Sequence, residues 1–276
     1  MTRAARPAAA GRHRDGIGRA PLAALAFLIL LPACADRARE RFEGAEKALL
    51  RQEMDAALAG FRSIPKEFPQ SRYSPAALLR QGDLYGSYYR NYDAALEAYD
   101  SLVYNFPQVA EAPQAILRKV EIHLLQFFSY AKAVEDLEYL RSRYPGFGKM
   151  DEALVLLAKA YGGLPDPSRQ AEALAELLER HPGSPRAMEA RWMQASALLG
   201  QERYSDADRA FRKILFLAPD KKSAARARWG LAQAMEGEGD YPGALEQYEA
   251  IRDDWEDPGY IEEKIGRLRK RMKDSP

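Results

Sequence analysis

Apolar and polar positions along this chain follow one pattern that returns six times between residues 38 and 258. Each repeat of the pattern contains two stretches in which apolar residues recur every three or four positions, as in an amphipathic helix, and a short turn separates the two stretches. A proline follows the second stretch at intervals of 38, 38, 37, 37 and 39 residues, at Pro69, Pro107, Pro145, Pro182, Pro219 and Pro258. Because proline lacks an amide donor and clashes with the preceding turn, we expect it to close a helix. The pattern therefore predicts six helical hairpins.

A second regularity lies inside the second helix of each hairpin. An alanine stands twelve residues before the proline and a bulky residue eight before it, in the pairs Ala57/Phe61, Ala95/Tyr99, Ala133/Leu137 and Ala207/Phe211. The alanine allows two helices to approach closely, and the bulky residue one turn later fills the space beside it. In the fourth hairpin, Ala171 and Ala175 take these two places, and each lies one residue closer to the proline than in the other hairpins. In the sixth hairpin, Ala244 and Tyr248 take them, and each lies two residues farther from the proline.

Turns are expected between the two helices of a hairpin, and the ends of the repeat region have their own patterns. Turn-forming residues occur at Arg90–Asp93, Gly162–Gly163 and Gly237–Asp240. Residues 39–51 and 53–67 are predicted as the two helices of the first hairpin. Residues 260–273 predict a polar helix in which Ile261, Ile265 and Leu268 share one face, as a capping helix requires.

The alanine, the aromatic residue and the closing proline together resemble the tetratricopeptide repeat, over roughly residues 40–258. The resemblance implies an all-α, right-handed solenoid of about six helical hairpins with a C-terminal capping helix. We expect residues 34–258 to form this solenoid, with repeats that end near residues 69, 107, 145, 182, 219 and 258. Residues 259–276 are expected to form the capping helix and a basic tail.

The N-terminus has the order of regions found in a secretory signal. A basic stretch precedes the apolar run from Leu22 to Leu31, which is too short to span a bilayer comfortably. The run ends in Leu31-Pro32-Ala33-Cys34, which contains the only cysteine of the chain. This tetrad resembles the lipobox of bacterial lipoproteins, which implies that residues 1–33 are a signal peptide and that Cys34 carries the lipid. Because Ala35 and not Asp follows Cys34, the resemblance favours the periplasmic face of the outer membrane.

The net charge and the scarcity of reactive side chains argue against several classes of function. Without the five arginines and one acid of residues 1–33, the chain keeps 36 basic and 39 acidic residues, which argues against a nucleic-acid binder. Two histidines remain, with no cysteine besides Cys34 and no glycine-rich phosphate loop. Glu121 and His123 point to different sides of a helix, and His181 takes a packing position held elsewhere by Phe68, Phe106 or Tyr144. We expect no enzymatic activity, no metal site and no cofactor.

Aromatic residues gather at the turns of the second and third hairpins. Tyr88 and Tyr89 stand at the first of these turns, and Phe127 and Phe128 at the second. They either pack between repeats or form an exposed apolar patch that binds a partner.

Two arginines recur in a similar way. Arg191 and Arg228 lie 37 residues apart, each within the string Ala-Arg-Trp that ends in Trp192 or Trp229. The tryptophans are expected to pack in the repeat core. The arginines are either solvated or line the concave face and meet acidic groups of a partner.

Two sequence segments in the early repeats point to a particular group of tetratricopeptide-repeat proteins. They are Phe-Pro-Gln-Ser-Arg-Tyr-Ser-Pro-Ala-Ala at 68–77 and Asn-Tyr-Asp-Ala-Ala-Leu-Glu-Ala-Tyr at 91–99. With the lipobox, they resemble the BamD-like outer-membrane assembly lipoproteins of the Bam complex. This implies a lipid-anchored periplasmic scaffold that binds envelope proteins, such as the barrel-insertion machinery, and supports assembly of outer-membrane β-barrels. Two alternatives stay open: a Tol-Pal-associated tetratricopeptide protein that coordinates envelope constriction, and a generic periplasmic adaptor.

Overall fold

The computed structural model describes residues 37–274, so the predicted signal peptide and the predicted lipid-attachment residue Cys34 lie outside the described residues. Residues 37–274 form thirteen helices and no strand, in agreement with the all-α prediction. None of these helices combines the length and the apolar composition that crossing a bilayer requires. The chain divides into two compact bodies, Met1–Arg80 and Gln81–Pro276, and each is described by itself.

The first body contains the first hairpin. A helix over residues 37–50 pairs with α2 (Met54–Glu67), close to the predicted ranges. Phe61 of α2 is fully buried, and its ring stands edge-on to Phe42 with 5.5 Å between the ring centroids. Gly60 lies against Ala45, where a Cβ on the glycine would stand only 2.8 Å from the alanine Cβ. Small residues therefore bring the two helices close together.

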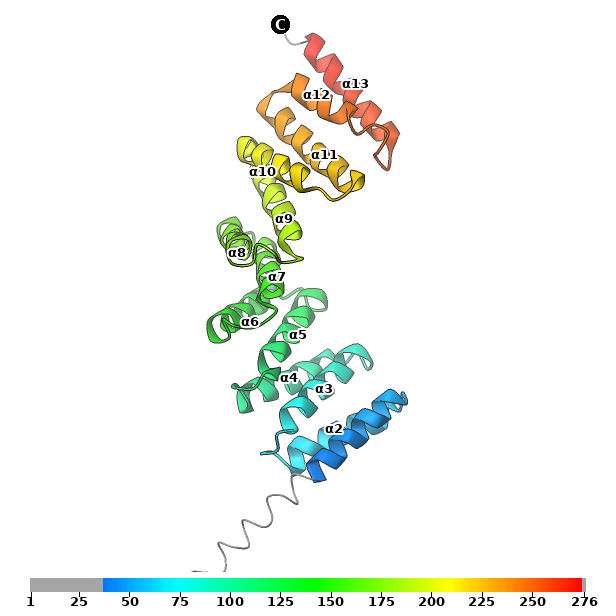
Figure 1. Cartoon of the computed structure of the whole chain (residues 1–276), viewed down its shortest axis with the longest axis vertical. Helices are drawn as coiled ribbons and strands as arrows, with labels where there is room; N and C mark the ends of the chain where they lie inside the picture. Colours follow the sequence, from blue (N-terminus) through cyan, green and yellow to red (C-terminus); the bar gives the residue numbers. More distant parts are fainter. Residues whose placement is uncertain (1–36, 275–276) are drawn as a thin grey trace, which may run out of the picture. The chain divides into compact units, whose positions relative to one another are not determined.

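The second body holds the remaining hairpins (Figure 1). It begins within α3 (Ser74–Ser87) and continues through α4 (Tyr92–Asn105), α5 (Glu111–Leu125), α6 (Tyr130–Arg143), α7 (Met150–Gly163), α8 (Pro167–Arg180), α9 (Ala187–Gly200), α10 (Tyr204–Leu217), α11 (Lys221–Glu238), α12 (Tyr241–Glu249) and α13 (Pro258–Asp274). From α4 onward each helix packs against the next, and first helices also touch across repeats, α5 with α7 and α9 with α11. Repeats 2 to 6 are thus the hairpins α3–α4, α5–α6, α7–α8, α9–α10 and α11–α12.

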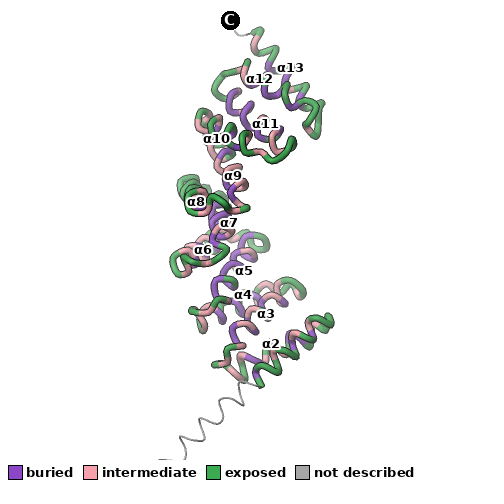
Figure 2. Tube along the Cα trace, in the orientation of Figure 1, coloured by how far each residue is buried: buried purple, intermediate pink, exposed green. Residues whose placement is uncertain are grey.

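The two helices of a hairpin are buried to different degrees (Figure 2). The first helices α5 and α7 bury nine and eight residues, whereas the second helices α6 and α8 bury three each. A first helix buries more because, besides two second helices, it also packs against the first helix of a neighbouring repeat, as α5 does against α7. From α5 onward the buried apolar side chains form two clusters, one from Ile116 to Ala190 and one from Ala195 to Leu268. The division between the clusters falls inside α9.

The predicted alanine and bulky positions are confirmed in four repeats of the second body. The alanines are fully buried and the bulky residues are at most 2 % exposed, in the pairs Ala95/Tyr99, Ala133/Leu137, Ala207/Phe211 and Ala244/Tyr248. Glycines of first helices make room for two of these rings. Gly82 lies against Tyr99 and Gly230 against Phe211, too close for a side chain to fit between.

The register predicted for the fourth repeat is wrong. Ala171 and Ala175 are exposed, and the buried bulky residue is Leu174, eight residues before Pro182. The place of the alanine, twelve residues before the proline, belongs to Gln170. The spacing in this repeat is therefore regular, and only the small residue has been replaced.

Gln170 fits at that place because the residue opposite has no side chain. Its Nε2 donates a hydrogen bond to the carbonyl oxygen of Ala158 at 3.2 Å, and the amide lies against Gly162. Gly162 and Gly163 were expected in a turn, but they form the end of α7. Their role in the helix is to allow close approach.

The last proline of the pattern differs from the first five. Those five each stand two residues beyond the end of a second helix, but α12 ends at Glu249 and Pro258 is the first residue of α13. Proline suits this position because the first amides of a helix have no acceptor within it. The capping helix therefore begins at residue 258, and its Ile261, Ile265 and Leu268 are buried as predicted.

Candidate partner-binding site

Five of the six hairpin turns contain a residue with a left-handed backbone at the same position. The φ values at equivalent positions are 62° at Gln52, 52° at Arg90, 50° at Phe128, 59° at Glu202 and 85° at Gly239. Glycine adopts this conformation freely, whereas an L-residue loses about 1–2 kcal/mol in it. A phenylalanine there is unusual, because bulky side chains are rare at positive φ. Phe128 is also 67 % exposed, so packing does not account for its presence.

The predicted aromatic residues lie at these turns with their side chains largely outside the core. Tyr88, Phe127 and Phe128 are exposed, and Tyr89 is half-buried with its ring 4.9 Å from that of Tyr88. Leu125, at the end of α5, is 66 % exposed. We call Tyr88, Leu125, Phe127 and Phe128 the apolar edge. Exposed apolar residues grouped in this way are typical of surfaces that bind proteins.

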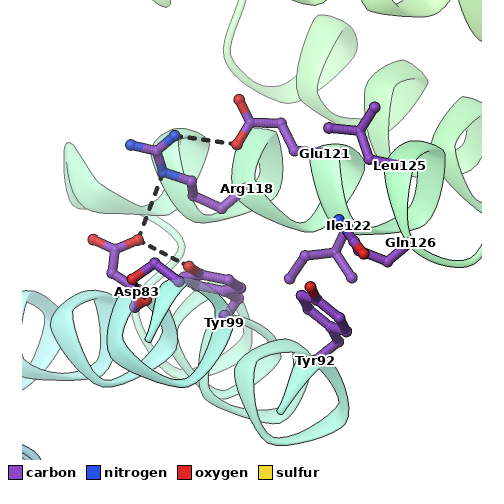
Figure 3. A pocket seen from close by; sticks show the side chains of 10 residues that line it. Asp83, Tyr92, Tyr99, Arg118, Glu121, Ile122, Leu125 and Gln126 are labelled. Carbon is purple, nitrogen blue, oxygen red and sulfur yellow. Dashed lines mark hydrogen bonds and ion pairs between the residues drawn. The ribbon is translucent and has the colours of Figure 1, made fainter. Parts of the chain in front are cut away.

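The turns of repeats 2 and 3 are neighbours, and a pocket of about 480 Å³ opens beside them. The ring of Phe127 stands 6.2 Å from that of Tyr92, the first residue of α4. Figure 3 shows Tyr92 and Ile122 on one side of the pocket and Asp83 and Arg118 on the other. Its full lining is Asp83, Gly86, Ser87, Tyr92, Tyr99, Arg118, Glu121, Ile122, Leu125 and Gln126. We call it the junction pocket; Leu125 belongs both to it and to the apolar edge.

The polar side of the junction pocket is a connected set of charges. The hydroxyl of Tyr99 donates to Oδ1 of Asp83 at 2.8 Å. Arg118 approaches Asp83 to 3.6 Å and donates to Oε2 of Glu121 at 3.1 Å. Burial, together with the charge of Asp83, raises the pKa of Tyr99, so its hydroxyl stays a donor. Two carboxylates and one guanidinium leave the pocket with one net negative charge.

The pocket lies where a recurring contact between repeats is missing. Tyr130 and Tyr204 each begin a second helix, and each ring lies against a glycine 33 residues later, Gly163 or Gly237. Tyr92 also begins a second helix, but residue 125 in that register is leucine. Tyr92 and Leu125 both line the pocket at this junction. This pairing of tyrosine with glycine at a spacing of 33 residues is a signal that the sequence carries.

A buried polar cluster lies beneath the turn of repeat 3. Nε2 of His123 is 3.5 Å from Oδ2 of Asp136, and Nζ of Lys119 is 2.9 Å from the other oxygen of Asp136. Burial lowers the pKa of His123 and raises the pKa of Asp136. Glu121 and His123 do face different sides of α5, one lining the pocket and the other in the interior. Within residues 37–274 there is no group of three or more His, Cys, Asp or Glu side chains placed to hold a metal ion.

The two predicted arginines contact different neighbours in the structure. Arg228 donates to Oε1 of Gln247 on α12 at 2.7 Å, and Arg191 donates to the carbonyl oxygen of Ala187 on its own helix at 3.2 Å. Both arginines are half-buried.

The tryptophans beside those arginines pack as expected. Trp192 stands 6.0 Å from Phe211, and Trp229 stands 5.1 Å from Tyr248, between ring centroids. Both tryptophans are partly buried against the second apolar cluster.

These features define a class: an all-α protein of stacked helical hairpins with an exposed surface suited to protein binding. Residues 155–222 and 192–258 match one family model described as tetratricopeptide repeat, and residues 76–108 match another. Residues 76–108 and 155–258 therefore contain tetratricopeptide repeats. Proteins built from this repeat are generally scaffolds and not enzymes, and the matched families are not catalytic. No curated protein sequence matches the chain.

Solved structures share the fold at low sequence identity. A tetratricopeptide repeat protein from Parabacteroides merdae is 16 % identical with a TM-score of 0.57, over 86 % of this chain and 87 % of that one. YrrB, described as a tetratricopeptide protein with an unusual peptide-binding site, is 17 % identical with a TM-score of 0.54, over 69 % and 90 %. PilW, described as a widely conserved type IV pilus biogenesis factor, is 15 % identical with a TM-score of 0.52, over 78 % and 92 %. At these identities the likeness shows the fold alone.

Proposed function

We propose that this protein is a lipid-anchored scaffold at the periplasmic face of the outer membrane, which binds protein partners through the apolar edge and the junction pocket. The observation that carries the binding part is the exposure of Tyr88, Phe127 and Phe128 beside a pocket. Aromatic side chains are enriched at protein interfaces because they bury much area with few rotatable bonds. The peptide-binding site described for YrrB makes a peptide segment of the partner a reasonable ligand.

The cellular part of the proposal is support for the assembly of outer-membrane β-barrel proteins. It rests on the lipobox at Leu31–Cys34 and on the phrases at 68–77 and 91–99, which resemble the BamD-like lipoproteins. A lipid anchor near the start of the chain would hold the repeats at the membrane where barrels are inserted.

A depletion experiment tests this function directly. Depletion of the protein is expected to lower the amount of folded barrel proteins in the outer membrane, measured by heat-modifiable migration on gels. Crosslinking from intact membranes is expected to recover components of the barrel-insertion machinery. Normal barrel levels together with no such crosslink contradict the proposal.

The strain depleted of the protein also distinguishes between the alternative functions. If barrels stay normal but envelope constriction fails during division, the Tol-Pal-associated role is the correct one. The fold shared with PilW is a reason to score pilus assembly in this strain as well. If none of these processes changes, the partner recovered by crosslinking defines the role of a more general adaptor.

A further inference from the structure

We infer that the junction pocket takes a basic side chain of the partner, and that the apolar edge takes the apolar residues next to it. The ligand would be a peptide segment with lysine or arginine beside leucine or an aromatic residue. This inference rests on the proposed binding function and names the chemistry of the partner.

The charges of the pocket carry the first half of the inference. Asp83 and Glu121 supply two carboxylates, and both already contact the single guanidinium of Arg118. A carboxylate can accept several hydrogen bonds, so each retains capacity for a further donor. The side chains of Asp83 and Glu121 are 30 % and 34 % exposed, so a ligand can reach them from solvent. A cation gains from the net negative charge, whereas an acidic group would meet both carboxylates near Arg118.

Two of the groups in the pocket have a fixed charge near neutral pH: Arg118 is charged and Tyr99 is neutral. Burial acts to lower the pKa of Arg118, but the hydrogen bond and charge of Glu121 and the charge of Asp83 raise it overall. The guanidinium therefore stays charged, and the raised pKa of Tyr99 keeps its phenol neutral. Neither group changes the charge of the pocket near neutral pH.

The apolar rim of the pocket supports the second part of the inference, that apolar residues of the partner lie next to its basic side chain. Tyr92 and Leu125 line the pocket, and the ring of Phe127 lies 6.2 Å from that of Tyr92. A basic side chain in the pocket can lie against the face of Tyr92, an arrangement that attracts cations. The residues next to it then meet Leu125, Phe127 and Phe128. The pocket and the apolar edge thus form one continuous surface with a charged end and an apolar end.

The test uses three short fluorescent peptides and the purified full-length chain. The first peptide alternates lysine with leucine and phenylalanine, the second replaces every lysine by glutamate, and the third keeps lysine but replaces the apolar residues by serine. Fluorescence anisotropy at low ionic strength measures each affinity, because salt screens such contacts. The first peptide is expected to bind at least about tenfold more tightly than either of the others.

Single substitutions test whether the first peptide binds at the junction pocket and the apolar edge. Glu121→Gln keeps the shape of the side chain and removes its charge, and is expected to weaken binding of the first peptide about three- to fivefold. Glu97→Gln, on the exposed side of α4 and outside the pocket, is the matched control and is expected to change nothing. Phe128→Ala is expected to weaken binding, whereas Tyr104→Ala, which removes an aromatic side chain 84 % exposed elsewhere on repeat 2, is not. Circular dichroism confirms that each variant is folded.

The inference is overturned if the glutamate peptide binds as tightly as the lysine peptide, if no peptide binds, or if Glu121→Gln behaves like Glu97→Gln. These outcomes are independent of the depletion experiment. Normal barrel assembly with intact lysine-dependent binding rejects the cellular role and leaves the ligand chemistry standing. Defective barrel assembly without such binding does the reverse.

Discussion

At the residue scale, two positions in the third repeat depart from what a simple helical hairpin needs. Phe128 has a φ of 50° and an exposed ring, in a place where glycine would be relaxed. His123 is a buried, titratable side chain within the core of the same hairpin. Both lie at or directly beneath the apolar edge, where strain and buried polar groups often accompany function.

Replacement of Phe128 by glycine is expected to stabilise the fold while weakening partner binding. The left-handed backbone becomes relaxed, and after the added freedom of the unfolded chain is subtracted, we expect a gain of about 0.5 kcal/mol in the free energy of unfolding. Urea denaturation measures it. Gly239→Ala, at the equivalent turn of repeat 6, serves as the reverse control and should lose at least about 1 kcal/mol. A clear loss of stability in Phe128→Gly would show that the ring packs in solution.

The stability of the fold is expected to depend on pH through His123. Burial places its pKa in the folded chain below the ordinary value of 6.5, so the unfolded chain takes up the proton first as the pH falls through 6.5. The free energy of unfolding should therefore decrease below pH 6.5, by no more than about 1.4 kcal/mol per pH unit. Asp136 favours the imidazolium, while Lys119 and Lys132 oppose it.

The variant His123→Gln isolates this effect from the opposite titration of Asp136, whose raised pKa favours the folded state at low pH. Denaturation curves between neutral and mildly acidic pH should show a flatter pH dependence for the variant than for the unchanged chain. Parallel curves would mean that His123 does not titrate differently on folding.

At the scale of helices, small residues decide how closely neighbouring hairpins approach. Gly163 and Gly237 receive the rings of Tyr130 and Tyr204, and Gly162 receives the amide of Gln170. The junction of repeats 2 and 3 lacks this contact because Leu125 replaces the glycine. The junctions of repeats 3 and 4 and of repeats 5 and 6 thus share this contact, and the candidate site lies at a junction that lacks it.

A side chain at Gly163 is expected to disturb the junction of repeats 3 and 4. The added Cβ of Gly163→Ala would stand 2.5 Å from Cδ1 of Tyr130, so we expect a loss of about 1–3 kcal/mol. Gly200 occupies the equivalent end of α9 with nothing within 4 Å, and Gly200→Ala should be neutral or slightly stabilising. Thermal unfolding of the two variants compares them directly, and equal midpoints would contradict the proposed contact.

The register of the fourth repeat can be tested in the same way. Ala95→Leu inserts a large side chain at a fully buried position and should cost about 1–3 kcal/mol. Ala171→Leu changes an exposed position and should have little effect. A larger loss of stability from Ala171→Leu than from Ala95→Leu would support the register first inferred from the sequence, in which Ala171 is buried.

The sequence predicted the parts of the fold that depend on local spacing and missed those that depend on contacts between distant residues. Alanine and proline intervals located the hairpins, because each interval is a fixed number of helical turns. Gln170 was missed because its size is tolerated only through Gly162, on another helix. Pro258 was misassigned because proline is compatible with both the end and the start of a helix.

The candidate site was predicted in part for the same reason. Tyr88, Phe127 and Phe128 could be placed at turns from their positions alone. The carboxylates of the junction pocket could not, because Asp83 and Glu121 belong to different helices, α3 and α5, and both reach Arg118 only in the folded chain. The arginines Arg191 and Arg228 recur at matching positions, yet each contacts a different neighbour, which periodicity alone does not show.

At the scale of the whole molecule, the proposed anchor and the repeats are close in sequence. Cys34 stands three residues before the helix over residues 37–50. A lipid at Cys34 would therefore attach the first hairpin almost directly to the membrane surface.

Cys34→Ser is expected to abolish membrane retention, because the thiol is needed for lipid attachment. Labelled palmitate incorporation and membrane fractionation measure the effect, with the unchanged chain as the reference. Equal labelling and equal recovery in the membrane fraction would exclude the lipid anchor.

The division of the apolar core inside α9 has a mechanical consequence. The only buried residues of that helix are alanines: Ala187 and Ala190 belong to the first cluster, and Ala195 belongs to the second. In a stack of repeats each hairpin is held mainly by its neighbours, so a weak junction separates regions that can open independently. The anchor at Cys34 and the turns of repeats 2 and 3 all precede α9 in the chain, so a force between the membrane and a bound partner does not pass through this junction. Repeats 5 and 6 can therefore open while the turns of repeats 2 and 3 keep their partner.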